Sequence, residues 1–186
     1  MKPIRFLFAF VLLVTACQEP QPRRPVEVRQ GTFLKQSAER NRKLLDEEET
    51  RMREIAEADS SRSYLLSSSG FRYYFDRQLP GEGYRPRPDD LVTLTYDLRT
   101  WNEDTIYRQE EIGLVRYKVD KQELFPGLRY SVKLLREGET ATFLFPSSLA
   151  FGYHGDEDRI GPNVPLKATL QILKIEPQEE PQNDTP

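Results

Sequence analysis

The residues that most often carry chemistry in proteins are scarce in this sequence. It contains one cysteine, Cys17, and one histidine, His154. Acidic residues follow His154 at Asp156, Glu157 and Asp158, but consecutive charges in a loop are more often solvated than metal-bound, so we expect no metal there. No nucleophile with a recognisable base, no glycine-rich phosphate loop and no Cys/His metal spacing is present. The sequence therefore predicts neither nucleophilic catalysis nor a cofactor.

Cys17 ends a segment that is typical of a lipoprotein signal. Lys2 and Arg5 precede an apolar run at 6–14, which is far shorter than the roughly 20 residues that span a bilayer. Val14-Thr15-Ala16-Cys17 matches the bacterial lipobox, in which the thiol is linked to diacylglycerol and the new N-terminus is acylated. We therefore expect a signal peptide over 1–16 and lipidation of Cys17 rather than a buried structural thiol. The lipid would hold the protein stably on a membrane of the cell envelope, facing the periplasm.

Composition narrows the class of the remaining chain. Hydrophobic residues make up 37% and charged residues 31%, which is too polar for a polytopic membrane protein. The net charge of −3 and the lack of a basic stripe give no reason to expect nucleic-acid binding. Most aromatic and β-branched residues lie between Phe71 and Ile175, so this segment is expected to supply the core.

The segment before this core divides into a tether and a helix. Residues 18–30 hold three prolines without apolar periodicity, which predicts a tether over 17–31. Residues 32–60 lack proline and are rich in Glu, Lys, Arg, Leu and Ala, which predicts a helix. Two polar residues, Asn41 and Glu48, interrupt its apolar seam of Leu34, Ala38, Leu45, Met52 and Ile55. Such a seam suits either docking on the same chain or a homodimer through 32–60.

The C-terminal part has the alternating pattern of strands. A serine-rich linker at 60–69 comes first, and a polar tail at 177–186 is expected to be disordered. Alternation and strand-forming residues predict strands over 71–75, 91–101, 105–107, 114–119, 140–145 and 168–175. Helical spacing predicts one helix over 124–135, and a long loop follows at 146–165. The fold class is therefore α+β, with a twisted antiparallel sheet wrapped around one short helix and preceded by an N-terminal helix.

Several short motifs occur in a characteristic order along this part. They are Pro80-Gly81-Glu82-Gly83, the run Asp90–Tyr96, Pro126-Gly127-Leu128, Glu137-Gly138-Glu139, the run Phe145–Gly152, and Ile160–Pro165 followed by Ala168-Thr169-Leu170. Their order and spacing resemble the FKBP-type peptidyl-prolyl cis-trans isomerases, with a domain over 70–176. With the lipobox and the preceding helix, the whole chain resembles the FKBP-type lipoproteins associated with gliding motility in bacteria.

The resemblance implies a function and a site. The function is isomerisation of X–Pro bonds in folding cell-envelope proteins, including the gliding-motility machinery, without a cofactor. The catalytic residues would be Tyr96, Phe125 and Phe151, and the backbone N–H of Phe125 would donate to the substrate. The remaining pocket lining would be Ile106, Tyr107, Val115, Leu124, Leu128, Val164 and Ile172.

This sequence departs from the family at several of these positions. Phe151 stands where the family usually has a tyrosine, and Tyr107 stands where it usually has an aspartate. Leu128 replaces the usual tryptophan, and phenylalanines are replaced by Ile106, Val115 and Ile172. A lost hydrogen bond of roughly 0.5–1.5 kcal/mol slows a reaction about 2–13-fold, so catalysis should weaken but persist. The alternatives are a weakly or non-catalytic chaperone or adaptor lipoprotein, and a purely structural motility lipoprotein.

Overall fold

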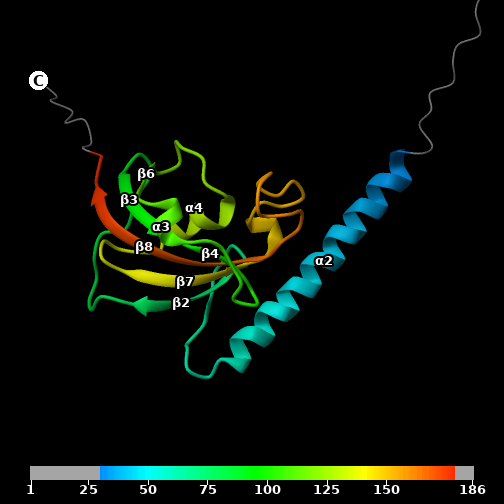
Figure 1. Cartoon of the computed structure of the whole chain (residues 1–186), viewed down its shortest axis with the longest axis horizontal. Coiled ribbons are helices and arrows are strands. Elements are labelled where there is room, and N and C mark those ends of the chain that lie inside the picture. The colour runs from blue at the N-terminus through cyan, green and yellow to red at the C-terminus, as the bar shows by residue number, and fades with distance from the viewer. Residues whose placement is uncertain (1–29, 179–186) are drawn as a thin grey trace, which may run out of the picture. The chain divides into compact units, whose positions relative to one another are not determined.

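The computed structural model describes residues 30–178 of the chain (Figure 1). The chain divides into two units, Met1–Glu39 and Arg40–Pro186. The predicted signal peptide, the lipidation site Cys17, nearly all of the tether and the end of the tail lie outside the described residues.

The helix α2 spans Gln30–Ala58, so the predicted N-terminal helix is confirmed to within two residues at each end. In its second half the inward-facing side chains recur every three or four residues: Leu44, Leu45, Glu48, Met52, Ile55 and Ala56. Glu48, which interrupts the apolar seam in the sequence, is only 7% exposed and belongs to this buried face. None of the helices within 30–178 is both long and apolar enough to cross a membrane.

One antiparallel sheet dominates the described residues. Its strands are β1 (Leu65–Leu66), β2 (Arg72–Arg77), β3 (Leu91–Tyr96), β4 (Leu98–Thr100), β5 (Thr105–Tyr107), β6 (Val115–Lys118), β7 (Thr140–Phe145) and β8 (Leu166–Glu176). The main path runs β1-β2-β7-β8-β3-β6, while β4 pairs with β8 and β5. The last strand, β8, is central because it pairs with β7, β3 and β4. A register shift between Thr93 and Leu94 interrupts the β3–β8 pairing, as a β-bulge does.

Two predicted strands, β5 and β7, have the observed bounds, and other elements differ because of specific contacts. The predicted strand 91–101 is divided at Asp97, whose carboxylate accepts the N–H of Thr169 at 2.8 Å. The serine-rich linker contains the short edge strand β1, because Leu65 pairs with Tyr73. A short helix that the sequence did not predict, α3 (Gln109–Ile112), begins where Glu111 accepts the N–H of Arg108.

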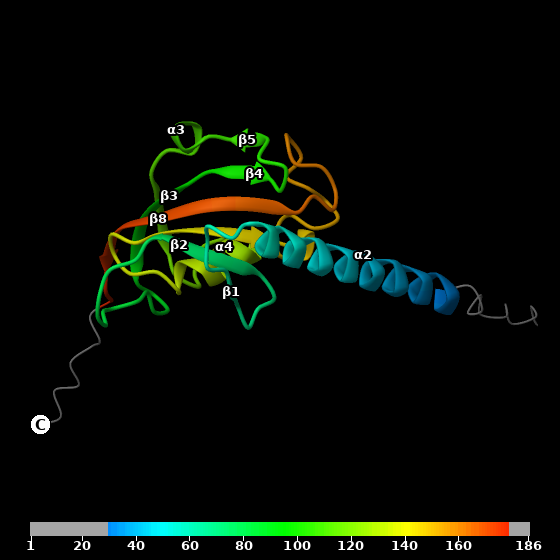
Figure 2. The same cartoon turned by 90° about the horizontal axis from the view of Figure 1, so that it is seen from below.

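The helix α4 (Pro126–Val132) packs on one face of the sheet (Figure 2). It is shorter than predicted, because the chain is extended at Phe125 and the helix ends at Lys133. Glycine is required at Gly127, since a Cβ there would lie 2.5 Å from a ring carbon of Phe145 on β7. This close approach joins α4 to the main core cluster, in which Leu128 and Val132 are fully buried. The predicted α+β architecture is thereby confirmed.

Candidate active site

The start of α4 carries a backbone donor without an acceptor among the described residues. Phe125 precedes Pro126, and proline disfavours helical geometry at the residue before it. Accordingly Phe125 is extended, with φ −60° and ψ 151°, while Pro126 occupies the first turn, where its missing N–H costs nothing. The Phe125 carbonyl accepts the N–H of Arg129 at 3.2 Å, but within 30–178 no acceptor is found for the Phe125 N–H. This N–H is therefore available to a ligand.

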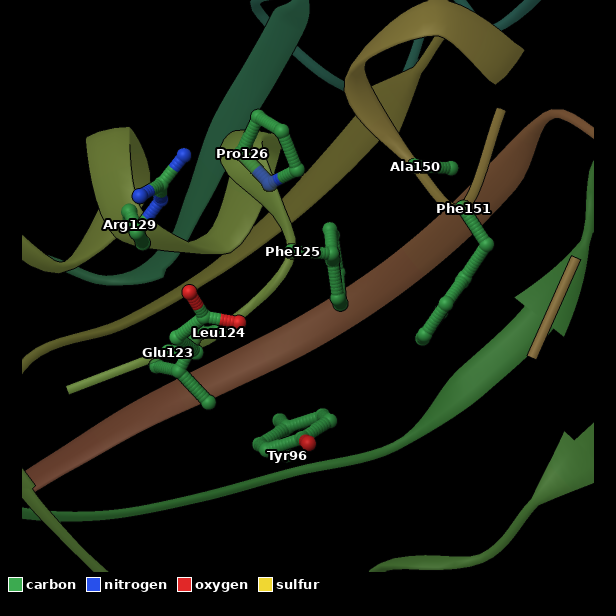
Figure 3. Close-up of a pocket in the computed structure, with 8 residues that line it drawn as sticks. All are labelled: Tyr96, Glu123, Leu124, Phe125, Pro126, Arg129, Ala150 and Phe151. Atoms are coloured by element: carbon green, nitrogen blue, oxygen red, sulfur yellow. The ribbon is translucent and has the colours of Figure 1, made fainter. Parts of the chain in front are cut away.

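A pocket of about 540 Å³ opens beside this donor. Three segments form it: the end of β3, the start of α4 with the residues before it, and the loop after β7 (Figure 3). Its lining consists of Tyr96, Glu123, Leu124, Phe125, Pro126, Arg129, Ala150 and Phe151. Because these segments are far apart in the sequence, only the folded sheet and helix bring the lining together.

Aromatic rings form the apolar wall of the pocket. The Phe125 and Phe151 rings lie next to each other (Figure 3), with centroids 5.2 Å apart and planes tilted by 42°. The Phe125 ring also meets that of Phe145 edge-on at 5.5 Å, which ties this wall to the core. Phe125 is 9% exposed, whereas Phe151 is half-buried. The wall is thus packed against the core on the helix side and half-buried on the loop side.

Tyr96 supplies a polar group to the same space. It is the last residue of β3, and its ring is half-buried in the pocket lining. Burial raises the pKa of the Tyr96 hydroxyl, so this group stays neutral and can donate at physiological pH. No hydrogen bond of that hydroxyl is found within 30–178, so it is free to bind a ligand.

Two charged side chains in the lining were not predicted. Glu123 lies just before the predicted pocket residue Leu124, and Arg129 lies one helical turn after Phe125. No ion pair is found for either charge within the described part of the chain. Phe125 and Arg129 are four residues apart, a spacing that places two residues on one face of a helix, so Arg129 could have been predicted. The sequence gives no comparable signal for Glu123. Ala150 and Pro126 were missed for a similar reason, since only the pocket shape selects them.

The structure brings Tyr96, Leu124, Phe125 and Phe151 together in the lining of this pocket, and the other predicted residues are not part of that lining. Leu128 and Ile172 have no exposed surface and belong to the core cluster. Four more are partly buried against that cluster: Ile106, Tyr107, Val115 and Val164.

Tyr107 takes part in a separate polar network on the loop 153–160. Its hydroxyl donates to Asp156 at 2.5 Å and contacts Asp158 at 3.1 Å, while the guanidinium of Arg159 lies 4.7 Å from its ring centre. The hydrogen bond to Asp156 raises the pKa of Tyr107 to about 12. Burial raises the pKa of Asp156, but hydrogen bonds from Tyr107 and from the N–H of Ile160 outweigh it and leave the pKa below its ordinary value. Tyr107 therefore fastens β5 to this loop.

The histidine and the acidic residues near it do not form a metal centre in the described structure. His154 is exposed, and its ring meets that of Tyr153 at 5.6 Å. Within 30–178 no three His, Cys, Asp or Glu side chains are placed to hold a metal ion. The lining of the pocket likewise contains no Ser, Cys or His; besides the apolar side chains it offers the polar groups of Tyr96, Glu123 and Arg129.

Comparison with known proteins agrees with this geometry. Residues 83–173 match the family described as FKBP-type peptidyl-prolyl cis-trans isomerase. Over 109 residues, 59% of the chain, the sequence is 35% identical to a probable FKBP-type peptidyl-prolyl cis-trans isomerase, FkpA, of Neisseria meningitidis serogroup B. The match covers 39% of that relative's length. The resemblance inferred from the short motifs is thus confirmed.

Solved structures support the fold. A peptidyl-prolyl cis-trans isomerase from Pseudomonas syringae pv. tomato has a TM-score of 0.58 at 19% identity, with 73% of this chain and 96% of that chain covered. FkpA from Escherichia coli has a TM-score of 0.56 at 18% identity, with 94% of this chain and 82% of that chain covered. At these identities the likeness concerns the fold alone.

Proposed function

We propose that this protein, whose residues 83–173 form an FKBP-type peptidyl-prolyl cis-trans isomerase domain, catalyses the cis–trans isomerisation of X–Pro bonds in other proteins. The observation that carries the proposal is the unpaired N–H of Phe125 beside a pocket with an aromatic wall. A proline ring fits the aromatic wall, and the chain around it can accept a hydrogen bond from that N–H.

The proposed mechanism needs no proton transfer. Rotation about a peptide bond must lose its resonance, at a barrier of roughly 18–20 kcal/mol. A catalyst lowers this barrier by binding the twisted amide better than either planar form. The wall of Phe125 and Phe151 removes the bond from water, which favours the planar and more polar amide. The N–H of Phe125 and the hydroxyl of Tyr96 then hold the peptide while the bond turns.

The expected location at the cell envelope indicates which proteins the domain would meet as substrates. The lipobox ending at Cys17 supports attachment to a membrane of the cell envelope, with the domain facing the periplasm. We therefore propose that the clients are X–Pro segments of folding envelope proteins. The resemblance of the whole chain to gliding-motility lipoproteins makes the gliding machinery the first set of clients to test.

The helix segment 32–60 could either dock on the same chain or form a homodimer, and the structure supports docking more than it supports a dimer. Burial of Glu48 and Met52 supports docking of the second half of α2 within the unit Arg40–Pro186. A homodimer through 32–60 rests on the seam in the sequence, and its test is the mass of the full chain by sedimentation equilibrium.

A proline-limited refolding assay tests the function. The wild-type chain at micromolar concentration is expected to accelerate the slow phase of an unfolded substrate protein. Phe151→Ala should lose at least about tenfold of this acceleration, because an apolar ring of this size contributes roughly 1.5–3 kcal/mol when buried. Phe75→Ala is the matched control, since Phe75 is also half-buried but lies outside the pocket lining.

The second candidate function is a chaperone or adaptor that binds apolar segments without catalysis. The observation in its favour is Phe151, which brings no hydroxyl to the loop side of the pocket. If the wild-type chain leaves the slow refolding phase unchanged but still suppresses aggregation, this candidate replaces the isomerase.

A further inference from the structure

Helix α2 contributes a buried carboxylate to the loop that follows β7. Oε2 of Glu48 accepts the backbone N–H of Ser147 at 2.8 Å, across 99 positions of sequence. Both residues are almost fully buried, at 7% exposure for Glu48 and 3% for Ser147. The other oxygen of Glu48, Oε1, is buried without a hydrogen-bond partner among the described residues. Both residues belong to the unit Arg40–Pro186.

Ser147 is the point from which the pocket loop is built. It begins the short 3₁₀ helix η1 (Ser147–Leu149). Its carbonyl accepts two N–H groups, from Ala150 at 3.1 Å and from Gly152 at 3.0 Å. The carbonyl of Gly152 in turn accepts the N–H of Asn163 at 2.7 Å, which joins the two sides of the loop. Phe151 lies between Ala150 and Gly152, so its position depends on the turn that starts at Ser147.

The contact with Glu48 completes the start of that turn. The first N–H groups of a helix have no partner within it, and a three-residue 3₁₀ turn has poor hydrogen bonds of its own. A carboxylate is the strongest side-chain acceptor for such an N–H. Without it, the buried N–H of Ser147 would lack an acceptor, and the turn would have to move toward water.

A carboxyl group at this place is unfavourable for the packing of the helix. Burial of a polar oxygen costs free energy unless it is hydrogen-bonded, and Oε1 of Glu48 has no partner among the described residues. An apolar residue would continue the seam of α2 without this penalty. The presence of Glu48 is therefore better explained by the loop that it holds than by the packing of the helix.

We propose that Glu48 is a positioning residue of the active site, through which helix α2 fixes Ala150 and Phe151 in the pocket wall. This proposal rests on the isomerase function proposed above. It assigns the N-terminal helix a part in catalysis, since the carboxylate acts on the pocket through the Ser147 turn and has no contact with the substrate.

Variants of the full chain test the proposal. Glu48→Leu removes the acceptor, and kcat/KM on an X–Pro peptide is expected to fall about 3–10-fold at a temperature where the variant is fully folded. In Glu48→Asp the carboxylate is one methylene too short to reach Ser147, so kcat/KM should also decrease. This variant replaces Glu48→Leu in the test if Glu48→Leu fails to fold. Glu48→Gln should stay within about twofold of wild type, because its amide oxygen still accepts the N–H. Glu49→Leu is the exposed neighbouring control.

A double-mutant cycle separates positioning from mere stabilisation. In a Phe151→Ala background, Glu48→Leu should lower kcat/KM by less than about 1.5-fold, because the side chain that Glu48 positions is gone. An equal loss in both backgrounds, or a lower melting temperature with unchanged kcat/KM, would overturn the proposal. If the wild type shows no isomerase activity, the proposed function fails first. Amide shifts of residues 147–152 that move in Glu48→Leu but not in Glu48→Gln would still support the contact, and unchanged shifts would refute it.

Discussion

Replacing Tyr96 by phenylalanine removes one hydroxyl from the pocket and leaves the ring in place. That hydroxyl makes no hydrogen bond within the described structure, so the free energy of unfolding should change by less than about 0.5 kcal/mol. If it donates to the bound peptide, its loss should cost roughly 0.5–1.5 kcal/mol in the transition state. This corresponds to a decrease in kcat/KM of about 2–13-fold.

The assay is the isomerisation rate of an X–Pro peptide at several peptide concentrations, with urea unfolding measured on the same samples. Because burial raises the pKa of Tyr96, the group stays protonated and the decrease should be the same from pH 6 to pH 8. Tyr130→Phe is the matched control, since Tyr130 is an exposed tyrosine of α4 outside the pocket lining. An unchanged kcat/KM in Tyr96→Phe would refute the role of the hydroxyl, and so would an equal decrease in Tyr130→Phe.

Three further predictions concern the polar contacts around the core. Glu139→Ala should destabilise the domain by about 3–5 kcal/mol in urea unfolding, because the buried guanidinium of Arg136, now 2.6 Å from the carboxylate, loses its counter-charge and keeps only backbone carbonyl acceptors; a loss below about 1 kcal/mol would contradict this. Tyr107→Phe should lower stability by about 1 kcal/mol through the lost bond to Asp156 and leave kcat/KM within about twofold, whereas a tenfold loss would place Tyr107 in the site. Burial raises the pKa of Glu139, but hydrogen bonds from Arg136 outweigh it, and the pKa of Asp156 is also below its ordinary value. Their contribution to stability is therefore complete well above their ordinary pKa values of 4.5 and 3.8 and is lost as the pH falls through their lower folded pKa values; a urea midpoint independent of pH from 6 to 2.5 would contradict it.

Local patterns predicted most of the fold. Strand-forming residues between turn residues placed β5 and β7 at their observed bounds, because aromatic and β-branched side chains favour extended backbone. Long-range contacts decided the rest. The strand β1 exists because Leu65 pairs with Tyr73 of the neighbouring strand, and a serine-rich composition gives no sign of such pairing. The break at Asp97 likewise depends on Thr169, far along the chain.

The candidate site shows the same division. Phe125 and its extended conformation followed from the proline that comes next. The apolar seam of the helix includes the position of Glu48, but no pattern shows what its carboxyl group binds, and a charged residue on a helix is expected to face water unless its partner is known. Its partner is a backbone N–H of the pocket loop, and only the folded chain brings the two together. Sequence periodicity thus reports which faces are apolar, while the polar contacts that order a loop come from tertiary structure.

The central claim is that the pocket beside Phe125 catalyses rotation about X–Pro bonds. Magnetisation-exchange NMR of an X–Pro peptide measures this rotation at equilibrium and without a coupling enzyme. Uncatalysed exchange takes tens of seconds or longer. With micromolar wild-type chain we expect cis–trans exchange within about a second. In a Phe125→Ala variant shown to be folded, the catalysed exchange rate should be at least about tenfold lower. An exchange rate that is the same with and without the wild-type chain would contradict the claim.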